Sequence, residues 1–254
     1  MVRKASKLVL VFLAAVIARS EDKDALRQQV LNASHASRID DVEMRPWHLK
    51  VKFELYGRDG KVSEAGAFEE WFAGLTLWKL RVESSSYTAT VIENRDGDFR
   101  TRGAGPIPLP IRAIERDIVY PMPMGENLSN TVPHVSRVKL EKLPLDCIQL
   151  TEPPIPASMS PTFCFDPGDG TLRAITSRGS WSMVRNKVGQ FEGHSAGLSI
   201  ITRDGNVETA SAEVVDLSEI AVNDGLFVPS TDMDKVTDMH TLKSCKSALT
   251  IRRP

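Results

Sequence analysis

The stretch that decides the fold is Trp47-His-Leu-Lys-Val-Lys-Phe-Glu-Leu-Tyr56, in which apolar and polar side chains alternate. Successive side chains of a β-strand point to opposite faces, so this stretch predicts a strand with one apolar and one polar face. Such one-sided strands are typical of antiparallel sheets, because the strands of parallel sheets are buried on both faces and read as continuous apolar runs.

The same period of two recurs on the C-terminal side of this stretch. Gly57-Arg-Asp-Gly60 predicts a hairpin turn, since Asp-Gly is a common turn dipeptide. Strands are then predicted at residues 65–72, 78–83, 87–91 and 98–102, at 137–143 with the pattern continuing through 145–150, and at 162–165, 172–177, 181–188, 198–203 and 207–217. We count about 10–11 strands, a number at which an antiparallel sheet curls or closes. The sequence therefore predicts a mainly β (α+β) fold, built as a curved antiparallel sheet or a half-open β-barrel.

Helical spacing is confined to short segments. Residues 21 to about 37 predict an N-terminal helix, and residues 111–120 predict a second, short one. The second lies in a Gly- and Pro-rich interval at residues 103–133, and loops of this length are often lids or partner surfaces. No repeat or domain boundary is visible, so we expect one domain at residues 21–228. The tail at residues 229–254 has no firm assignment beyond a helix predicted at 232–240.

The first 20 residues have the pattern of a secretory signal peptide. Arg3, Lys4 and Lys7 form a basic start, and eleven apolar residues, Leu8–Ala18, follow before small residues that suit cleavage. This run is shorter than the about 20 residues that a membrane span requires. The sequence therefore predicts an exported protein, periplasmic or secreted, with an uncleaved anchor as the alternative.

Charge and hydropathy limit the partners of the remaining chain. Cleavage after Ser20 would remove Arg3, Lys4, Lys7 and Arg19 and change the formal net charge from −1 to −5. A mildly acidic chain without a basic stripe is unlike a nucleic-acid-binding protein. No later apolar segment approaches the length of a membrane span, so we expect no stable span after signal cleavage.

Three cysteines suit an exported chain in which a disulfide can form. Cys147 and Cys164 lie in two strand-like runs that a Pro-rich loop joins, and a hairpin of these runs would bring the two sulfur atoms together. We therefore predict a Cys147–Cys164 disulfide. Cys245 is left over, and we interpret it as a thiol near the C-terminus rather than as a metal ligand.

One motif matches an enzyme signature. Gly193-His-Ser-Ala-Gly197 fits the G-x-S-x-G nucleophile elbow of serine hydrolases, with Ser195 as nucleophile and His240 as base. The acidic candidates in the required chain order are Asp216, Asp224 and Asp232. An elbow needs a strand before it and a helix after it, whereas residues 198–203 predict a strand. A serine hydrolase is therefore the alternative function, not the leading one.

No metal or cofactor site is predicted. The five histidines lack paired spacing, and Asp166-Pro-Gly-Asp-Gly170 fits a plain turn better than a calcium loop. Phosphate-binding and dinucleotide-binding glycine motifs do not occur in the sequence.

Large apolar side chains are concentrated on the early strands. The candidate ligand-binding residues are Trp47, Leu49, Val51, Phe53, Trp71, Trp78 and Leu80. They fit two interpretations, an ordinary core under the N-terminal helix or an apolar cavity for an acyl chain.

The order of these elements resembles that of the LolA-like superfamily of periplasmic lipoprotein carriers. The resemblance is carried by Leu49-Lys-Val-Lys-Phe-Glu-Leu55, Gly66-Ala-Phe-Glu-Glu-Trp-Phe72, Leu77-Trp-Lys-Leu-Arg81 and the Asp96-Gly97 turn, and extends over residues 21 to about 220. The sequence also resembles a group of uncharacterised exported bacterial proteins with the same Phe-Glu-Glu-Trp run. The resemblance implies a half-open β-barrel whose concave side is plugged by short helices and accepts lipid. The Pro-rich insert at 103–133 and the paired cysteines depart from the carrier pattern, so lipoprotein delivery does not follow from the fold.

The leading hypothesis is thus a non-enzymatic periplasmic protein. It would bind an apolar ligand, such as a lipid or a lipoprotein acyl chain, or an envelope protein, on a curved β-sheet. The alternatives are the serine hydrolase and a structural interaction module of the envelope.

Overall fold

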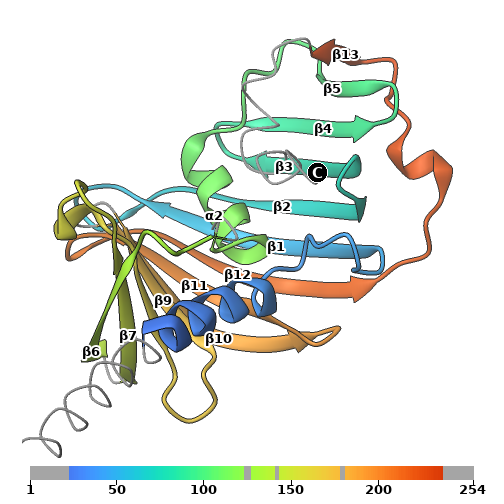
Figure 1. Ribbon diagram of the computed structural model, residues 1–254. Helices are drawn as coiled ribbons and strands as arrows, with labels where there is room; N and C mark the ends of the chain where they lie inside the picture. Colours follow the sequence, from blue (N-terminus) through green and yellow to red (C-terminus); the bar gives the residue numbers. More distant parts are fainter. Residues whose placement is uncertain (1–22, 123–126, 141–142, 178–180, 237–254) are drawn as a thin grey trace, which may run out of the picture. The chain divides into compact units, whose positions relative to one another are not determined.

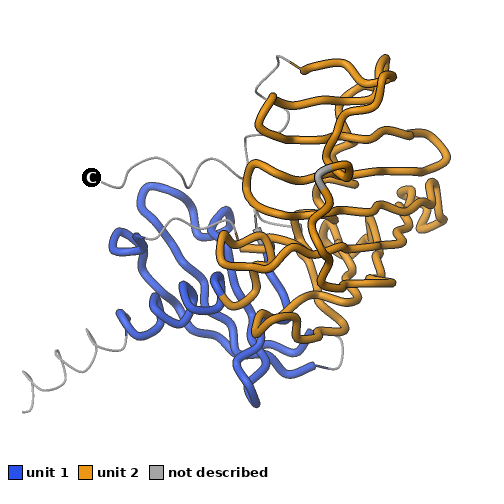
Figure 2. The backbone as a smooth tube through the Cα atoms, turned by 90° about the vertical axis from the view of Figure 1, so that its right-hand side faces the viewer, with its two compact units in different colours: residues 1–35, 124–179 blue, residues 36–123, 180–254 orange. Residues whose placement is uncertain are grey.

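The computed structural model describes residues 23–122, 127–140, 143–177 and 181–236 (Figure 1). The chain forms two compact units, each made of two separate stretches of sequence (Figure 2). Unit 1 comprises residues 1–35 and 124–179, and unit 2 comprises residues 36–123 and 180–254. The sequence gives no sign of this division, because each unit is discontinuous along the chain. The single domain expected at residues 21–228 stays a prediction.

Unit 2 contains nine antiparallel strands in the order β13-β5-β4-β3-β2-β1-β12-β11-β10. Their bounds are β1 (Trp47–Tyr56), β2 (Val62–Gly74), β3 (Leu77–Ser84), β4 (Thr88–Asn94), β5 (Gly97–Thr101), β10 (Trp181–Phe191), β11 (His194–Asp204), β12 (Val207–Glu219) and β13 (Met233–Val236). The strands at the two ends of this order, β13 and β10, are not paired with each other. The sheet is therefore open rather than closed into a barrel.

Unit 1 contains four antiparallel strands in the order β9-β8-β7-β6. Their bounds are β6 (Val132–Leu140), β7 (Leu143–Thr151), β8 (Thr162–Phe165) and β9 (Leu172–Ser177). The described residues thus hold thirteen strands, all antiparallel where their pairing is defined, against about 10–11 expected from the sequence. The predicted class, mainly β with antiparallel strands, is confirmed.

The two predicted helices are present. Residues 23–36 form the N-terminal helix, and α2 (Leu109–Val119) forms the short helix expected at 111–120. Two 3₁₀ turns, η1 (Ala157–Met159) and η2 (Asp224–Phe227), complete the helical elements of the described residues. Among these residues no helix combines the length and the apolar character needed to cross a bilayer. The predicted signal peptide at residues 1–20 lies outside the described part of the chain.

The helix predicted at residues 232–240 is wrong where the structure describes it. Met233–Val236 forms strand β13, which pairs with β5, and the remaining residues lie outside the described part. An edge strand has unpaired backbone N–H and C=O groups on one side, and here β13 pairs with these groups of β5. An ion pair of 2.9 Å between Arg102 Nε and Asp234 Oδ1 accompanies this pairing.

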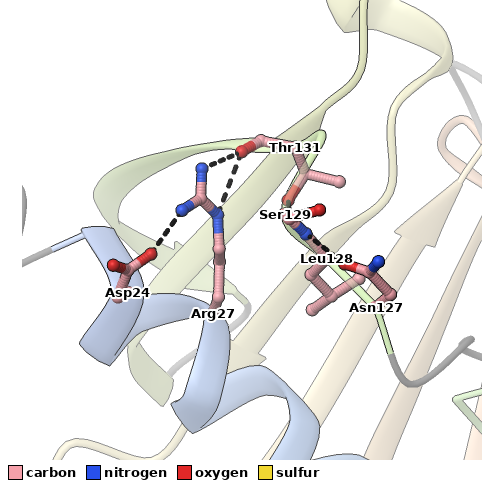
Figure 3. Close-up of polar contacts among 6 residues, drawn as sticks. All are labelled: Asp24, Arg27, Asn127, Leu128, Ser129 and Thr131. Carbon is pink, nitrogen blue, oxygen red and sulfur yellow. Dashed lines mark hydrogen bonds and ion pairs between the residues drawn. The ribbon is translucent and has the colours of Figure 1, made fainter.

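The N-terminal helix is attached to the turn before β6 in unit 1 (Figure 3). The Arg27 guanidinium donates from Nε to the Thr131 carbonyl oxygen at 3.1 Å and from Nη1 to Asp24 Oδ1 at 2.5 Å. Asn127 Oδ1 accepts a hydrogen bond of 2.9 Å from the Ser129 backbone N–H, which stabilises the turn itself. One arginine therefore connects segments that are 104 residues apart in the chain.

The predicted disulfide is confirmed in unit 1. Cys147 of β7 and Cys164 of β8 are direct partners across the two strands, and their sulfur atoms are bonded. Both side chains are buried. Cys245, the remaining cysteine, lies outside the described residues.

Replacing both bonded cysteines by serine should lower the free energy of unfolding of unit 1 by about 3 kcal/mol, because the bridge closes a loop of 17 residues. Urea unfolding of wild type and double variant, followed by circular dichroism, measures this loss. A reductant should lower the midpoint of the wild type and leave that of the variant unchanged. Equal midpoints without reductant would contradict the prediction.

Candidate functional site

The candidate site is the inner face of unit 2, by which we mean the apolar side of its sheet. Six of the seven predicted ligand-binding residues lie on it, and each of the six is at most 3% exposed. These are Trp47, Leu49, Val51, Phe53, Trp78 and Leu80. Neighbouring strands add Phe68, Phe72, Val82, Ala89, Val91, Ile200, Ala210 and Ala212 to the same face.

Trp71, the seventh predicted residue, lies on the opposite face. It pairs across the strands with His48, whose ring stacks on the indole at a centroid distance of 4.9 Å. The Lys79 ammonium lies 5.1 Å from the centroid of the same ring. Alternation along β2 explains the placement, because Phe72 points to the inner face and its neighbour must point away from it.

Helix α2 packs on β11 and β12. Figure 1 shows it crossing one face of the unit 2 sheet. Its buried apolar residues recur three and four positions apart, so they form one stripe along the helix. Ile111, Ile114 and Ile118 of this stripe are at most 1% exposed. Leu109-Pro110 opens the helix, and proline suits a first turn because it has no N–H to leave unbonded.

The C-terminal end of α2 is held by the segment before β1. The backbone N–H of Ile39 donates to the Val119 carbonyl oxygen at 3.0 Å, and the Ile39 carbonyl accepts from Trp47 Nε1 at 2.6 Å. The Arg38 guanidinium lies 4.6 Å from the centroid of the Tyr120 ring. α2 is thus anchored at its end, whereas its N-terminal side follows the Gly- and Pro-rich residues 103–108.

A fully buried arginine lies beneath α2. Arg185 of β10 donates from Nη1 to the Ser195 carbonyl oxygen at 3.1 Å and from Nη2 to the Asp117 carbonyl oxygen at 3.4 Å. Gly197 makes room for it, because a Cβ at this position would lie 3.1 Å from Arg185 Nε. The guanidinium therefore connects the sheet to the helix through backbone oxygens.

The helix adds a buried carboxylate. Asp117 Oδ1 accepts from Nε and Nη2 of Arg116 at 3.1 and 2.9 Å, whereas Oδ2 is buried and accepts no hydrogen bond from the described residues. Burial raises the pKa of Asp117 to about 6, and the positive charges of Arg116 and Arg185 oppose this shift. A second ion pair, between half-buried Arg112 and buried Glu115, lies one turn earlier at 3.3 Å. The interface under α2 is therefore only partly apolar.

Two carboxylates lie on the inner face far from Arg185 in the strand order, and sequence reasoning missed both. Glu70 of β2 is fully buried, and Glu93 of β4 accepts a hydrogen bond of 2.7 Å from Trp78 Nε1. The alternation around Phe68 and Phe72 could have revealed Glu70, because residues 68, 70 and 72 must share a face. The inner face therefore has an arginine on one side and acidic groups on the other.

Ser195 does not lie on a nucleophile elbow, so that prediction is wrong. It belongs to strand β11, pairs with Gln190 of β10 and is buried. The turn between β10 and β11 consists of Glu192 and Gly193, with φ of 50° and 85°, and two positive φ values are typical of a tight hairpin turn. Gly193 thus serves a turn, not an oxyanion hole.

The other members of the proposed triad do not restore it. Asp216 lies in β12, where its Oδ2 is 3.3 Å from Nδ1 of His48 on the face opposite α2. Asp224 begins η2, Asp232 precedes β13, and His240 lies outside the described residues. Within the described part of the chain, no three His, Cys, Asp or Glu side chains are grouped so that they could hold a metal ion.

Known proteins offer only distant comparisons. No protein-family model and no curated protein matches the sequence. Among solved structures, a LolA superfamily protein from Nitrosomonas europaea is 11% identical, with a TM-score of 0.48 over 80% of this chain and 97% of its own. An outer membrane lipoprotein-sorting protein domain from Vibrio parahaemolyticus is 8% identical, with a TM-score of 0.45 over 82% and 96%. A DUF1329 family protein from Desulfovibrio piger is 8% identical, with a TM-score of 0.49 over 81% and 96%.

Proposed function

We propose that this chain is a non-enzymatic protein that binds a lipid or an acyl chain on the inner face of unit 2, in the place that α2 occupies. The observation that supports the proposal is the nature of the cover. α2 lies on an apolar face, yet it buries the charged side chains of Glu115 and Asp117. Burying charges with incomplete hydrogen bonding weakens an interface, so the helix is a replaceable cover rather than optimal core packing.

Exchange of α2 for a ligand is energetically feasible. Burial of apolar surface contributes about 25 cal/mol per Å², whichever molecule supplies the surface. An acyl chain can therefore replace the contacts of Ile111, Ile114 and Ile118 at little net cost. Burial disfavours the ionised form of Asp117. Displacement of α2 would expose this carboxylate to water and remove that cost.

The compartment and the partner belong to the same proposal. We infer export from the leader at residues 1–20, which precedes the described residues. An exported protein that covers an acyl chain would carry it through an aqueous space, to or from an envelope protein or membrane. N-terminal sequencing of the mature protein tests the export step.

Titration of the purified chain with a fluorescent fatty acid should give saturable binding with quenching of tryptophan emission, because Trp47 and Trp78 lie on the inner face. Hydrogen exchange should locate the site. Amides of residues 109–119 should lose protection on binding, whereas those of the N-terminal helix at 23–36 should keep it. Absence of uptake, or uptake with unchanged protection of α2, would contradict the proposal.

A further inference from the structure

Strand β6 of unit 1 is paired on one side only. It pairs with β7 and is the last strand in the order, so no described strand pairs with its other side (Figure 1). Residues 134–139 of this strand are all exposed. Every second residue of an antiparallel edge strand directs its backbone N–H and C=O away from the neighbouring strand. The nine residues of β6 therefore present a row of hydrogen-bonding groups about 30 Å long.

The covered part of the unit 1 sheet ends at β7. Leu145 and Ile148 of β7 are 1% and 3% exposed. The residues opposite them on β6, Val138 and Val135, are 39% and 62% exposed. Leu145 and Ile148 are three positions apart, so they lie on opposite faces of the sheet. Both faces of β6 are therefore accessible, and a strand added beside it would bury apolar surface of the two valines.

Two cations share one face of β6 near its C-terminal end. Arg137 and Lys139 are two positions apart, and Val135 precedes them on the same face. Arg137 Nε lies 2.7 Å from Asp146 Oδ1 on β7, yet the arginine side chain is 75% exposed. Opposite charges on adjacent strands stabilise the pairing, and like charges directly opposite each other destabilise it. This edge therefore favours an acidic strand.

A second copy of β6 is a poor partner for this edge. A symmetric antiparallel pair centred on Ser136 would gather Arg137 and Lys139 of both copies on one face. It would also include Pro133 of both copies, which has no N–H to donate. Charged residues and proline are the means by which natural edge strands avoid pairing with their own kind.

We propose that β6 is a docking strand for an extended acidic segment of a partner protein, which adds to the sheet as a further strand. Backbone hydrogen bonds would supply the affinity, and alternate side chains the specificity. An antiparallel segment would read acidic-x-acidic-x-apolar, with its acids opposite Lys139 and Arg137 and its apolar residue opposite Val135. This inference goes beyond the proposed function, because it concerns the edge of unit 1 and requires no lipid.

Three synthetic peptides test the charge preference. The first is Thr-Glu-Thr-Glu-Thr-Val-Thr, and in the other two both glutamates are replaced by alanine or by lysine. Fluorescence anisotropy of labelled peptides at low ionic strength measures their binding to the full chain without added lipid. The glutamate peptide should bind about 2- to 30-fold more tightly than the alanine peptide, the range expected for two pairs of opposite charge. The lysine peptide should bind most weakly.

Backbone methylation tests strand addition separately from charge. One glutamate peptide is N-methylated at both glutamates and the valine, and another at the three threonines that follow the first glutamate. In an added strand only one of these two sets of N–H groups faces β6, so one peptide should lose binding and the other should retain it. Hydrogen exchange with the unmethylated peptide should show new protection within residues 132–140 and no change at residues 109–119 of α2.

A charge reversal assigns the preference to the edge. Lys139→Glu should remove the preference for the glutamate peptide, because one favourable pair becomes a repulsive one. Lys139 is exposed, so we expect the variant to fold as the wild type does. Lys61→Glu is the matched control, because Lys61 lies in an exposed turn of unit 2 and its side chain is 84% exposed. This variant should bind all three peptides as the wild type does.

The outcomes are independent of fatty-acid binding, which is measured with a different probe at a different unit. Equal binding of the three peptides, binding of none, or equal loss with both methylated peptides would overturn the docking inference and leave the proposed function intact. Sedimentation that shows a dimer strengthened by Lys139→Glu would also overturn it, and would assign β6 to a second copy. Failure of the fatty acid to bind would overturn the proposed function and leave this inference intact.

Discussion

Truncation of Ile114 to alanine should tighten the binding of the fluorescent fatty acid while it destabilises the protein. Ile114 is 1% exposed in the middle of the α2 stripe, and deletion of a buried isoleucine side chain costs about 2–5 kcal/mol. If α2 and the ligand compete for one face, the variant spends more time with the face uncovered. Apparent affinity rises with that open fraction, so we expect a dissociation constant about 10- to 100-fold lower.

A matched truncation in the other unit distinguishes competition from general loosening. Ile148 of β7 is 3% exposed in unit 1, and Ile148→Ala should lower stability to a similar extent without changing the affinity for fatty acid. Affinity is measured by fluorescence titration and stability by urea unfolding of the same samples. If α2 were ordinary core, Ile114→Ala would bind no better than wild type, and that result would contradict the competition.

The inner face could be predicted from the sequence because strand alternation is local. The residues from Trp47 to Tyr56 fix the direction of each side chain without information from the rest of the chain. The partners of β1 are not local, since β2 lies next in sequence but β12 comes more than 150 residues later. Trp71 was assigned to the wrong face because it was grouped by residue type rather than by its position next to Phe72.

The polar part of the candidate site was not predictable in the same way. Arg185 occupies an ordinary position in a predicted strand, and its buried guanidinium donates to the carbonyl oxygen of Asp117, which is 68 residues away. Charged residues are usually exposed, so a pattern-based prediction assigns both to the surface. The Gly193–Gly197 motif illustrates the opposite error. Its sequence fits a catalytic elbow, but the structure has a two-residue hairpin turn at Glu192 and Gly193.

Asp117→Asn should stabilise unit 2 at neutral pH by about 3 kcal/mol and leave it nearly unchanged at pH 4. The pKa of Asp117 is raised from 3.8 to about 6 by burial, with Arg116 and Arg185 opposing the shift. Between these values the unfolded chain ionises while the folded chain retains its proton, so stability falls as pH rises. A shift of about two pKa units corresponds to about 3 kcal/mol above pH 6, and asparagine removes that penalty.

The sign of this effect distinguishes Asp117 from an ordinary surface carboxylate. Asp146 in unit 1 is exposed and ion-paired, and the Arg137 guanidinium lowers its pKa, so this group contributes stability above its usual pKa and loses it in acid. Asp146→Asn should therefore weaken the protein slightly at pH 7, whereas Asp117→Asn should strengthen it. Urea unfolding of both variants from pH 4 to pH 8 measures the two slopes. A destabilised Asp117→Asn protein at pH 7 would mean that its ion pairs outweigh its burial, and α2 would then be a firmly held helix rather than a replaceable cover.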